Sequence, residues 1–452
     1  MQLSVLRDLF RLAWPVLVAQ IAIMANGVID TIMAGRYGTI DLAAVGVGAA
    51  VYATTFIALM GVLLGLTPVA AQLHGAGRHA EVGEEVRQSV WLALALGTIS
   101  VLLLIFPEPI LAVSRLAPEV EAKVRAYLRA IAWGVPAALL FRVFYGFTTA
   151  IAFPRVVMAL NLAGVALKLP LNAVFMYGYL GAPELGGPGC AVASAIIAWA
   201  VCVAGWVWCY AAARYRPYRV FARWSWPHWH ALRHLLALGV PIGVTFLVDV
   251  TAFTFMALFI ARLGAYASGS HQIAANLAAF MFMLPLALGN AAAILVGHAV
   301  GANRYDRARA TGIVAIGLGM ALAVLTSSVL ALAGERIAAL YTPDPEVHRR
   351  AAILLLFVAA YHLFDALQAI AVNVLRGYKR TFVPMVIYAV VLWGVGLGGG
   401  YTLGLTDLGL GRFGWPVPLG APGFWAGAIA GVALAGTLVT AYFLWMSRRI
   451  VR

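Results

Sequence analysis

Three carboxylic acids stand alone in stretches of sequence that are otherwise apolar. They are Asp30, Asp249 and Asp365, within residues 12–35, 235–261 and 351–375. A carboxylate inside a bilayer costs about 2.5 to 3.5 kcal/mol on insertion scales, so acids in spans should face the protein interior and mark a functional site. Such a group can hold a proton or a bound cation, because either one removes the cost of an isolated charge. The three acids therefore predict ion-coupled chemistry.

Polar side chains at helical spacing accompany these acids. Tyr361 lies four residues before Asp365 and shares its helical face, so the phenol is predicted to contact the same ion or a substrate cation. Gln272 and Asn276 also share a face. We expect these two either to line a substrate cavity or to form a hydrogen bond between helices.

Lys168 is a cation inside an apolar stretch and needs a partner there. It stands in the sequence Lys168-Leu-Pro-Leu-Asn172, and a buried ammonium is costly unless it is paired. Asp30 is the only intramembrane acid in the same half of the chain. We therefore predict an Asp30–Lys168 pair, direct or linked by water, with Asn172 and Lys168 near the substrate cavity.

The elements that carry these residues are predicted to be membrane-spanning helices. The 452 residues are 63% hydrophobic and only 11% charged, which excludes a soluble protein. A helix of about 20 apolar residues crosses the roughly 30 Å hydrocarbon core. Twelve such windows occur, near residues 9–33, 42–72, 88–107, 124–150, 154–178, 188–211, 234–261, 270–300, 310–333, 351–375, 382–403 and 423–446. The fold class is an all-α polytopic membrane protein.

The glycine run from Gly394 to Gly400 falls in the eleventh window. It resembles a phosphate-binding loop only superficially, because no strand precedes it and no Lys-Ser/Thr pair follows it. We expect close helix packing or a local break of the helix there.

The net charge of +14 is distributed asymmetrically. With both termini on one side, 19 Lys and Arg lie in the terminal segments and even-numbered loops, against 10 on the opposite side. The positive-inside rule then places both termini in the cytoplasm. The basic and aromatic segment 211–234 is expected to lie on the anionic membrane surface rather than to bind nucleic acid.

The chain contains an internal repeat. Leu12-Ala-Trp-Pro15 matches Leu238-Gly-Val-Pro241, and Gly75-Ala76 matches Gly301-Ala302, at the same offset of 226 residues. The repeat predicts an N-lobe of spans 1–6 (residues 1–210), the linker 211–234, and a C-lobe of spans 7–12 (residues 235–452). Because both halves enter from the same side, the two lobes are predicted to be related by a pseudo-twofold axis along the membrane normal.

The repeat does not copy the acids. The position that corresponds to Asp30 is Met256, and Asp249 lies seven residues earlier, two turns along the same helical face. Each half therefore contributes an acid, and the two acids are expected at different depths in the membrane.

Several stretches together resemble the multidrug and toxic compound extrusion (MATE) family, in its NorM-like branch. They are Val28–Gly35 with Asp30, Pro68–Gly77, Pro170–Asn172, Asp249, His271–Asn276, Tyr361 with Asp365, and Leu375–Tyr378. The resemblance covers essentially the whole chain.

This resemblance implies a twelve-helix antiporter of the bacterial inner membrane, a monomer without a cofactor, which exports cationic amphiphilic drugs and dyes in exchange for Na⁺ or H⁺. By analogy, Asp30 is the first-helix acid, and Asp249, Tyr361 and Asp365 form the C-lobe cation site, where Na⁺ would bind. Two departures stand out. The branch usually has Glu in place of Asp249 and Asn in place of Lys168, and the ammonium puts an N-lobe sodium site in doubt.

Two other functions compete with drug export. A flippase for lipid-linked oligosaccharides would belong to the same superfamily, but it would favour an arginine-rich cavity over isolated acids. A membrane-embedded enzyme would need a nucleophile–base pair or clustered ligands near one surface. The nine histidines are scattered along the chain, so we expect a transporter and not an enzyme.

Overall fold

The computed structural model describes residues 2–108, 111, 116–407 and 418–451, and within these residues the regular elements are all helices. Eleven of the described helices are long and apolar enough to cross a membrane, and the count is twelve if the bent pair α6 (Pro118–Ala132) and α7 (Val135–Ala150) forms one span. These two helices meet at 45°. Helices satisfy every backbone hydrogen bond internally, which a lipid environment requires. The predicted all-α polytopic fold is confirmed, with eleven or twelve candidate spans in the described residues.

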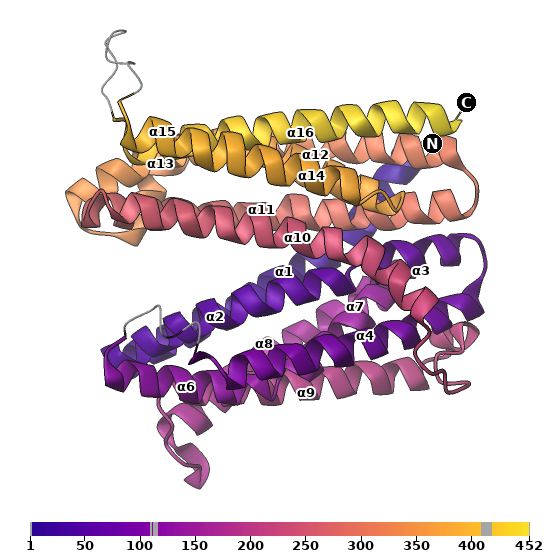
Figure 1. Ribbon diagram of the computed structural model, residues 1–452, viewed down its shortest axis with the longest axis horizontal. Helices are drawn as coiled ribbons and strands as arrows, with labels where there is room; N and C mark the ends of the chain where they lie inside the picture. The colour runs from indigo at the N-terminus through magenta and orange to yellow at the C-terminus, as the bar shows by residue number, and fades with distance from the viewer. Residues whose placement is uncertain (1, 109–110, 112–115, 408–417, 452) are drawn as a thin grey trace. The chain divides into compact units, whose positions relative to one another are not determined.

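The first compact unit, called the N unit here, comprises Trp14–Gly243. Its helices are α1 (Gln2–Tyr37, from Trp14 onward), α2 (Thr39–Leu63), α3 (Leu66–Gly75), α4 (His79–Ile105), α6 (Pro118–Ala132), α7 (Val135–Ala150), α8 (Pro154–Tyr177), η1 (Tyr179–Gly181), α9 (Pro188–Ala211), η2 (Ala213–Tyr218) and the start of α10. Helix α9 packs against α6, α7 and α8, and α4 packs against α7 (Figure 1). The buried core of the unit is built on these contacts.

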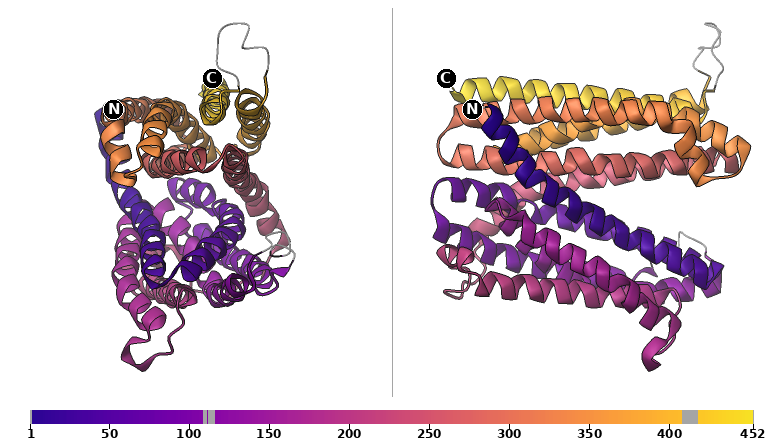
Figure 2. Two further views of the ribbon diagram at one scale, coloured as in Figure 1. Left: turned by 90° about the vertical axis from the view of Figure 1, so that its left-hand side faces the viewer. Right: turned by 180° about the vertical axis from the view of Figure 1, so that it is seen from behind.

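The second compact unit, the C unit, comprises Met1–Ala13 and Val244–Arg452. It contains α10 (Trp229–Ala261) from Val244 onward, then α11 (Ala265–Gly301), α12 (Tyr305–Tyr341), α13 (Pro345–Gly377), α14 (Phe382–Val391), the π-helical segment η3 (Leu392–Gly398), α15 (Gly399–Leu405) and α16 (Ala421–Val451). Helix α13 is central, because it packs against α11, α12 and α16. Seen nearly end-on, the helices of each unit form a bundle rather than a flat layer (Figure 2).

The boundaries of the units differ from those of the predicted lobes. Residues 1–13 belong to the C unit, and the second division falls after Gly243 instead of at residue 234. The physical reason is that each boundary between the units falls inside a continuous helix. The first boundary lies within α1 and the second within α10. Apolar windows in the sequence indicate where a helix starts. The boundary of a unit depends instead on which other helices each part of that helix contacts.

The internal repeat reappears in the turns between helices. Gly77 and Asn303, at the predicted offset, both have positive φ, 73° and 56°. Each turn also has a matching hydrogen bond, from Arg78 N to Leu73 O at 2.9 Å and from Arg304 N to Ala299 O at 2.8 Å. The two halves thus use the same backbone device to connect α3 with α4 and α11 with α12.

At the glycine run in the eleventh window the expected close packing is confirmed, whereas the helix is not broken but changes its geometry. The first part of the run lies in η3, where the helix widens to π geometry. The run also packs closely against α16: a Cβ added to Gly431 would lie only 2.8 Å from the Cα of Gly396. The absence of side chains at these positions lets the two backbones approach each other.

The basic and aromatic segment 211–234 packs against other helices of the N unit, to which it belongs, and the sequence did not reveal these contacts. Gln88 of α4 donates to Ser225 Oγ and to Trp226 O, both at 2.9 Å, and its Oε1 accepts from His228 N at 2.8 Å. The ring of Tyr218 is buried and meets Phe147 of α7 edge-on. Burial raises the pKa of Tyr218 to about 12. The segment is therefore anchored to helices α4 and α7.

Candidate functional site

Asp249 of α10 is hydrogen-bonded to a tyrosine that the sequence analysis did not identify. The hydroxyl of Tyr388, on α14, donates to Asp249 Oδ1 at 2.7 Å. Tyr388 is only 3% exposed. A buried phenol requires a partner for its hydroxyl, and a hydrogen bond to a charged carboxylate is stronger than one between neutral groups. The bond fixes the orientation of the Asp249 carboxyl group.

Tyr361 and Asp365 come from successive turns of α13 and are both buried. Asp249 and Asp365 interact electrostatically with each other and with both tyrosines. The structure therefore joins the three residues predicted for the C-lobe site, together with Tyr388, in one group. We call Asp249, Tyr361, Asp365 and Tyr388 the acid–tyrosine cluster.

The cluster has the electrostatics of a cation or proton site. Two carboxylates in a medium of low dielectric constant repel each other strongly when both are ionised. A proton or a bound monovalent cation removes this repulsion. The two phenol groups supply further oxygen atoms, which are the ligands that hard cations prefer.

Asp249 lies in the wall of a small pocket that is lined by both polar and apolar residues. Its volume is about 30 Å³, and Gln368, Asn373, Arg376 and Tyr388 are among its lining residues. One water needs roughly 10 to 15 Å³ on this measure, so the pocket has room for about two waters or a small ion. Arg376 is 8% exposed, and its Nη1 donates to Asn373 Oδ1 at 3.1 Å. The pocket therefore has a carboxyl group and a guanidinium group in its wall.

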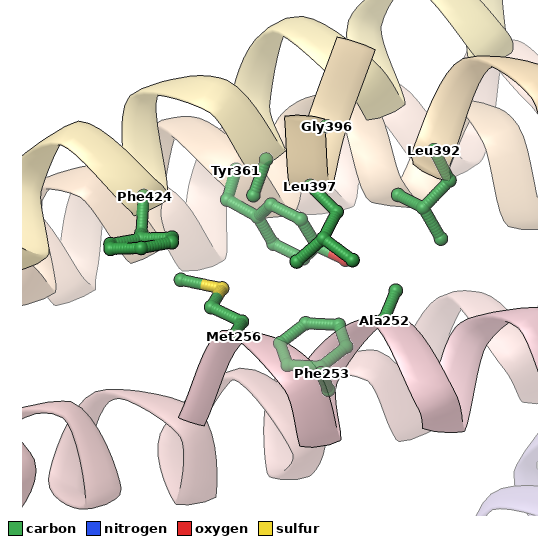
Figure 3. A pocket seen from close by; sticks show the side chains of 9 residues that line it. Ala252, Phe253, Met256, Tyr361, Leu392, Gly396, Leu397 and Phe424 are labelled. Carbon is green, nitrogen blue, oxygen red and sulfur yellow. The ribbon is translucent and has the colours of Figure 1, made fainter. Parts of the chain in front are cut away.

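A second pocket, of about 20 Å³, is apolar and includes Tyr361 in its wall. Figure 3 shows Ala252, Phe253 and Met256 of α10 facing Tyr361 and the η3 residues across this space. The Tyr361 ring meets Phe253 edge-on, with centroids 6.0 Å apart. Tyr361 therefore connects the acid–tyrosine cluster to an apolar, aromatic surface.

The predicted Asp30–Lys168 pair is confirmed in the N unit. Lys168 Nζ of α8 lies 2.9 Å from Asp30 Oδ1 of α1. Asn172, one helical turn after Lys168, donates from Nδ2 to the same Oδ1 at 2.8 Å. Lys168 is 1% exposed and Asn172 is fully buried, so the pair is held away from solvent. The pairing is direct and needs no bridging water.

Gln272 and Asn276 lie on one face of α11, as predicted. Gln272 Nε2 is 3.5 Å from Asn276 Oδ1, a hydrogen bond along the helix rather than between helices. Both side chains are exposed, and neither belongs to the walls of the two pockets described above. Their assignment to a substrate cavity stays a prediction.

Sequence reasoning missed three functional candidates: Tyr388, Arg376 and Ser194. Arg376 appeared only as part of the stretch Leu375–Tyr378, and Ser194 forms a hydrogen bond with Lys168 Nζ from α9. A tyrosine or arginine inside an apolar span is itself a signal, because its polar end needs a partner. The identity of that partner depends on which helices face each other.

Comparison with known proteins agrees with this architecture. The family model MatE matches residues 15–174 and again 241–402. The first residues of the two matches are separated by the same offset as the two copies of the internal repeat.

Among the relatives, a protein of Aromatoleum aromaticum described as "Probable multidrug resistance protein NorM" is 41% identical over 98% of this chain and 94% of its own length. The "Multidrug resistance protein PmpM" of Pseudomonas aeruginosa is 38% identical over 99% of this chain and 93% of its own. A solved structure of the "MATE transporter NorM-NG", in a complex that includes a monobody, has a TM-score of 0.82 and 31% identity, covering 97% of this chain and 94% of that one. The chain belongs to the MatE family and is a NorM-like transporter, not an enzyme.

Proposed function

We propose that this chain is a cation-coupled antiporter that exports cationic amphiphilic drugs and dyes from the bacterial cytoplasm, with Na⁺ or H⁺ as the coupling ion. The observation that carries the proposal is the acid–tyrosine cluster of the C unit. It holds two carboxyl groups that interact with each other, and Asp249 adjoins a pocket with room for water or an ion. Such a site responds to protons or monovalent cations.

The substrate class follows from the relatives and from the charges inside the spans. Two of the relatives are described as multidrug resistance proteins, one of them as a probable one. Acids inside the spans and the aromatic walls around Tyr361 favour an organic cation over an anion. Gln272 and Asn276 are the candidates for further substrate contacts. Asn172 and Lys168, which the sequence placed near the cavity, are buried and bonded to Asp30.

Coupling requires that ion and substrate favour different states of the transporter. In the proposed cycle, a proton or cation at Asp249 and Asp365 stabilises one arrangement, and the exported compound stabilises the other. A ligand that binds both arrangements equally shifts no equilibrium, however tightly it binds. In the proposed cycle the cluster binds the ion more tightly in the first arrangement than in the second, and this difference in affinity drives the change between them.

Both termini face the cytoplasm in this proposal, as the distribution of Lys and Arg favours. Fusions of a periplasm-active and a cytoplasm-active reporter to the C-terminus test the orientation. We expect activity of the cytoplasmic reporter alone. Activity of the periplasmic reporter would show that the C-terminus lies outside the cytoplasm and would contradict the proposed topology.

The central experiment measures uptake of a fluorescent organic cation into everted membrane vesicles. A Na⁺ gradient and a proton gradient are imposed separately, for the natural chain and for Asp249→Asn and Asp365→Asn. One gradient is expected to drive uptake, and both variants are expected to lose that dependence.

The matched control is Asp306→Asn. Asp306 is an exposed acid in the first turn of α12, and its replacement is expected to leave transport unchanged. If neither gradient moves any cationic dye although the protein is folded, drug export is the wrong assignment. A lipid-linked substrate then becomes the leading alternative.

A further inference from the structure

The ammonium group of Lys168 is surrounded by three oxygen atoms from three different chemical groups. Besides the Asp30 carboxylate, Nζ donates to the carbonyl oxygen of Cys190 at 3.1 Å and to the hydroxyl of Ser194. An ammonium has three N–H donors, so this arrangement uses all of them. Asp30, Cys190 and Ser194 come from α1 and α9, while Lys168 enters from α8.

These oxygen atoms form the kind of ligand set that holds an alkali cation. A carboxylate, a backbone carbonyl and a hydroxyl are hard oxygen donors, which small metal cations without covalent preferences favour. The side chain of Asn172 donates to Asp30 Oδ1 and so keeps the carboxylate oriented toward this point. The nitrogen of Lys168 takes the place in which a free cation would sit.

We infer that Lys168 is a tethered cation that permanently fills a monovalent-cation site of the N unit and thereby excludes mobile ions from Asp30. This inference deepens the proposed function, on which it rests, by assigning ion binding to the C unit alone. Asp30 and Lys168 neutralise each other throughout the transport cycle. The number of ions exchanged per cycle is then set by the acid–tyrosine cluster.

The tether has a consequence that a structural salt bridge would not have. If the three oxygen atoms form a cation site, removal of the ammonium should create binding of Na⁺ that depends on Asp30. Lys168→Met is the suitable change, because methionine keeps most of the apolar stem and ends about one atom short of the oxygens. The double variant Lys168→Met/Asp30→Asn removes the charge that attracts the ion.

The test is equilibrium binding of radioactive Na⁺ to the purified full-length protein in lipid nanodiscs, at about pH 8.5, where protons compete least for carboxylates. Lys168→Met is expected to bind one more Na⁺ per chain than the natural protein, and the double variant is expected to lose the extra ion. Lys168→Arg keeps the charge and is expected to gain none. A folded Lys168→Met protein without additional binding would overturn the inference.

A second arm needs no change at Lys168. Asp30→Asn alone is expected to leave Na⁺ binding unchanged, because the lysine already occupies the site, and a loss of bound Na⁺ would show that mobile ions reach Asp30. Neither arm uses a drug or a gradient. Failure of the inference is therefore distinguishable from failure of drug export, which the vesicle assay tests.

Discussion

Replacing Gly431 with alanine tests how closely α16 and η3 must approach each other. A Cβ at Gly431 would lie 2.8 Å from the Cα of Gly396 and 3.0 Å from its nitrogen. The optimal separation of two carbon atoms is about 3.5 to 4.0 Å, so the two backbones would have to separate by roughly 1 Å. Backbone atoms cannot rotate away as a flexible side chain can.

The matched control is Gly396→Ala, on the other side of the same contact. Its Cβ would meet Gly431 Cα at 3.8 Å, which is ordinary contact, and the Leu392 side chain at 3.3 Å. Leucine is flexible enough to move by a few tenths of an ångström. Both variants gain the same reduction in unfolded-chain entropy, so the comparison isolates the steric cost.

Overpacking in a close-packed interior costs about 1 to 3 kcal/mol, and we expect Gly431→Ala to be less stable than Gly396→Ala by that amount. Thermal unfolding of the purified proteins in the same detergent measures the difference. Gly431→Ala should also reduce dye transport, because η3 contributes Leu392, Gly396 and Leu397 to the pocket beside Tyr361. Equal melting temperatures for the two variants would refute the reasoning.

Three further outcomes are expected. Tyr388→Phe removes the hydrogen-bond donor to Asp249. It should raise the cation concentration needed for half-maximal transport about tenfold or more, because a hydrogen bond to a charged group contributes about 1.5 to 3 kcal/mol. An unchanged concentration would show that Tyr388 does not belong to the site. Asp344 caps α13, because its side chain accepts hydrogen bonds from two backbone N–H groups at 2.9 Å. Asp344→Ala should lower the free energy of unfolding by about 0.5 to 2 kcal/mol, measured by thermal unfolding. Asp344→Asn keeps the acceptor and should lower it much less. Equal losses for the two would contradict the capping role. Gln88→Ala releases the segment 211–234 and should speed tryptic cleavage after Arg223, whereas equal cleavage rates would show that Gln88 does not anchor it.

The sequence was sufficient for the spans, the repeat and the acids inside the spans. Apolar windows, basic loops and the spacing of identical residues are local properties, and the lipid environment leaves a helix as the only way to satisfy the backbone of a span. The Asp30–Lys168 pair was also within reach, because a buried ammonium must find an acid and the N-terminal half offers only one inside its spans.

The tertiary structure alone decided which side chains complete each site. Tyr388 is 139 residues from Asp249 along the chain, and Ser194 and the Cys190 carbonyl reach Lys168 from another helix. Helical periodicity fixes the face on which a residue lies, but not the helix that packs against that face. This choice depends on the packing of all the side chains in the bundle, including the glycines that let α16 approach η3. The sequence therefore determined which charges must be compensated, and the packing of the helices determined the partners that compensate them.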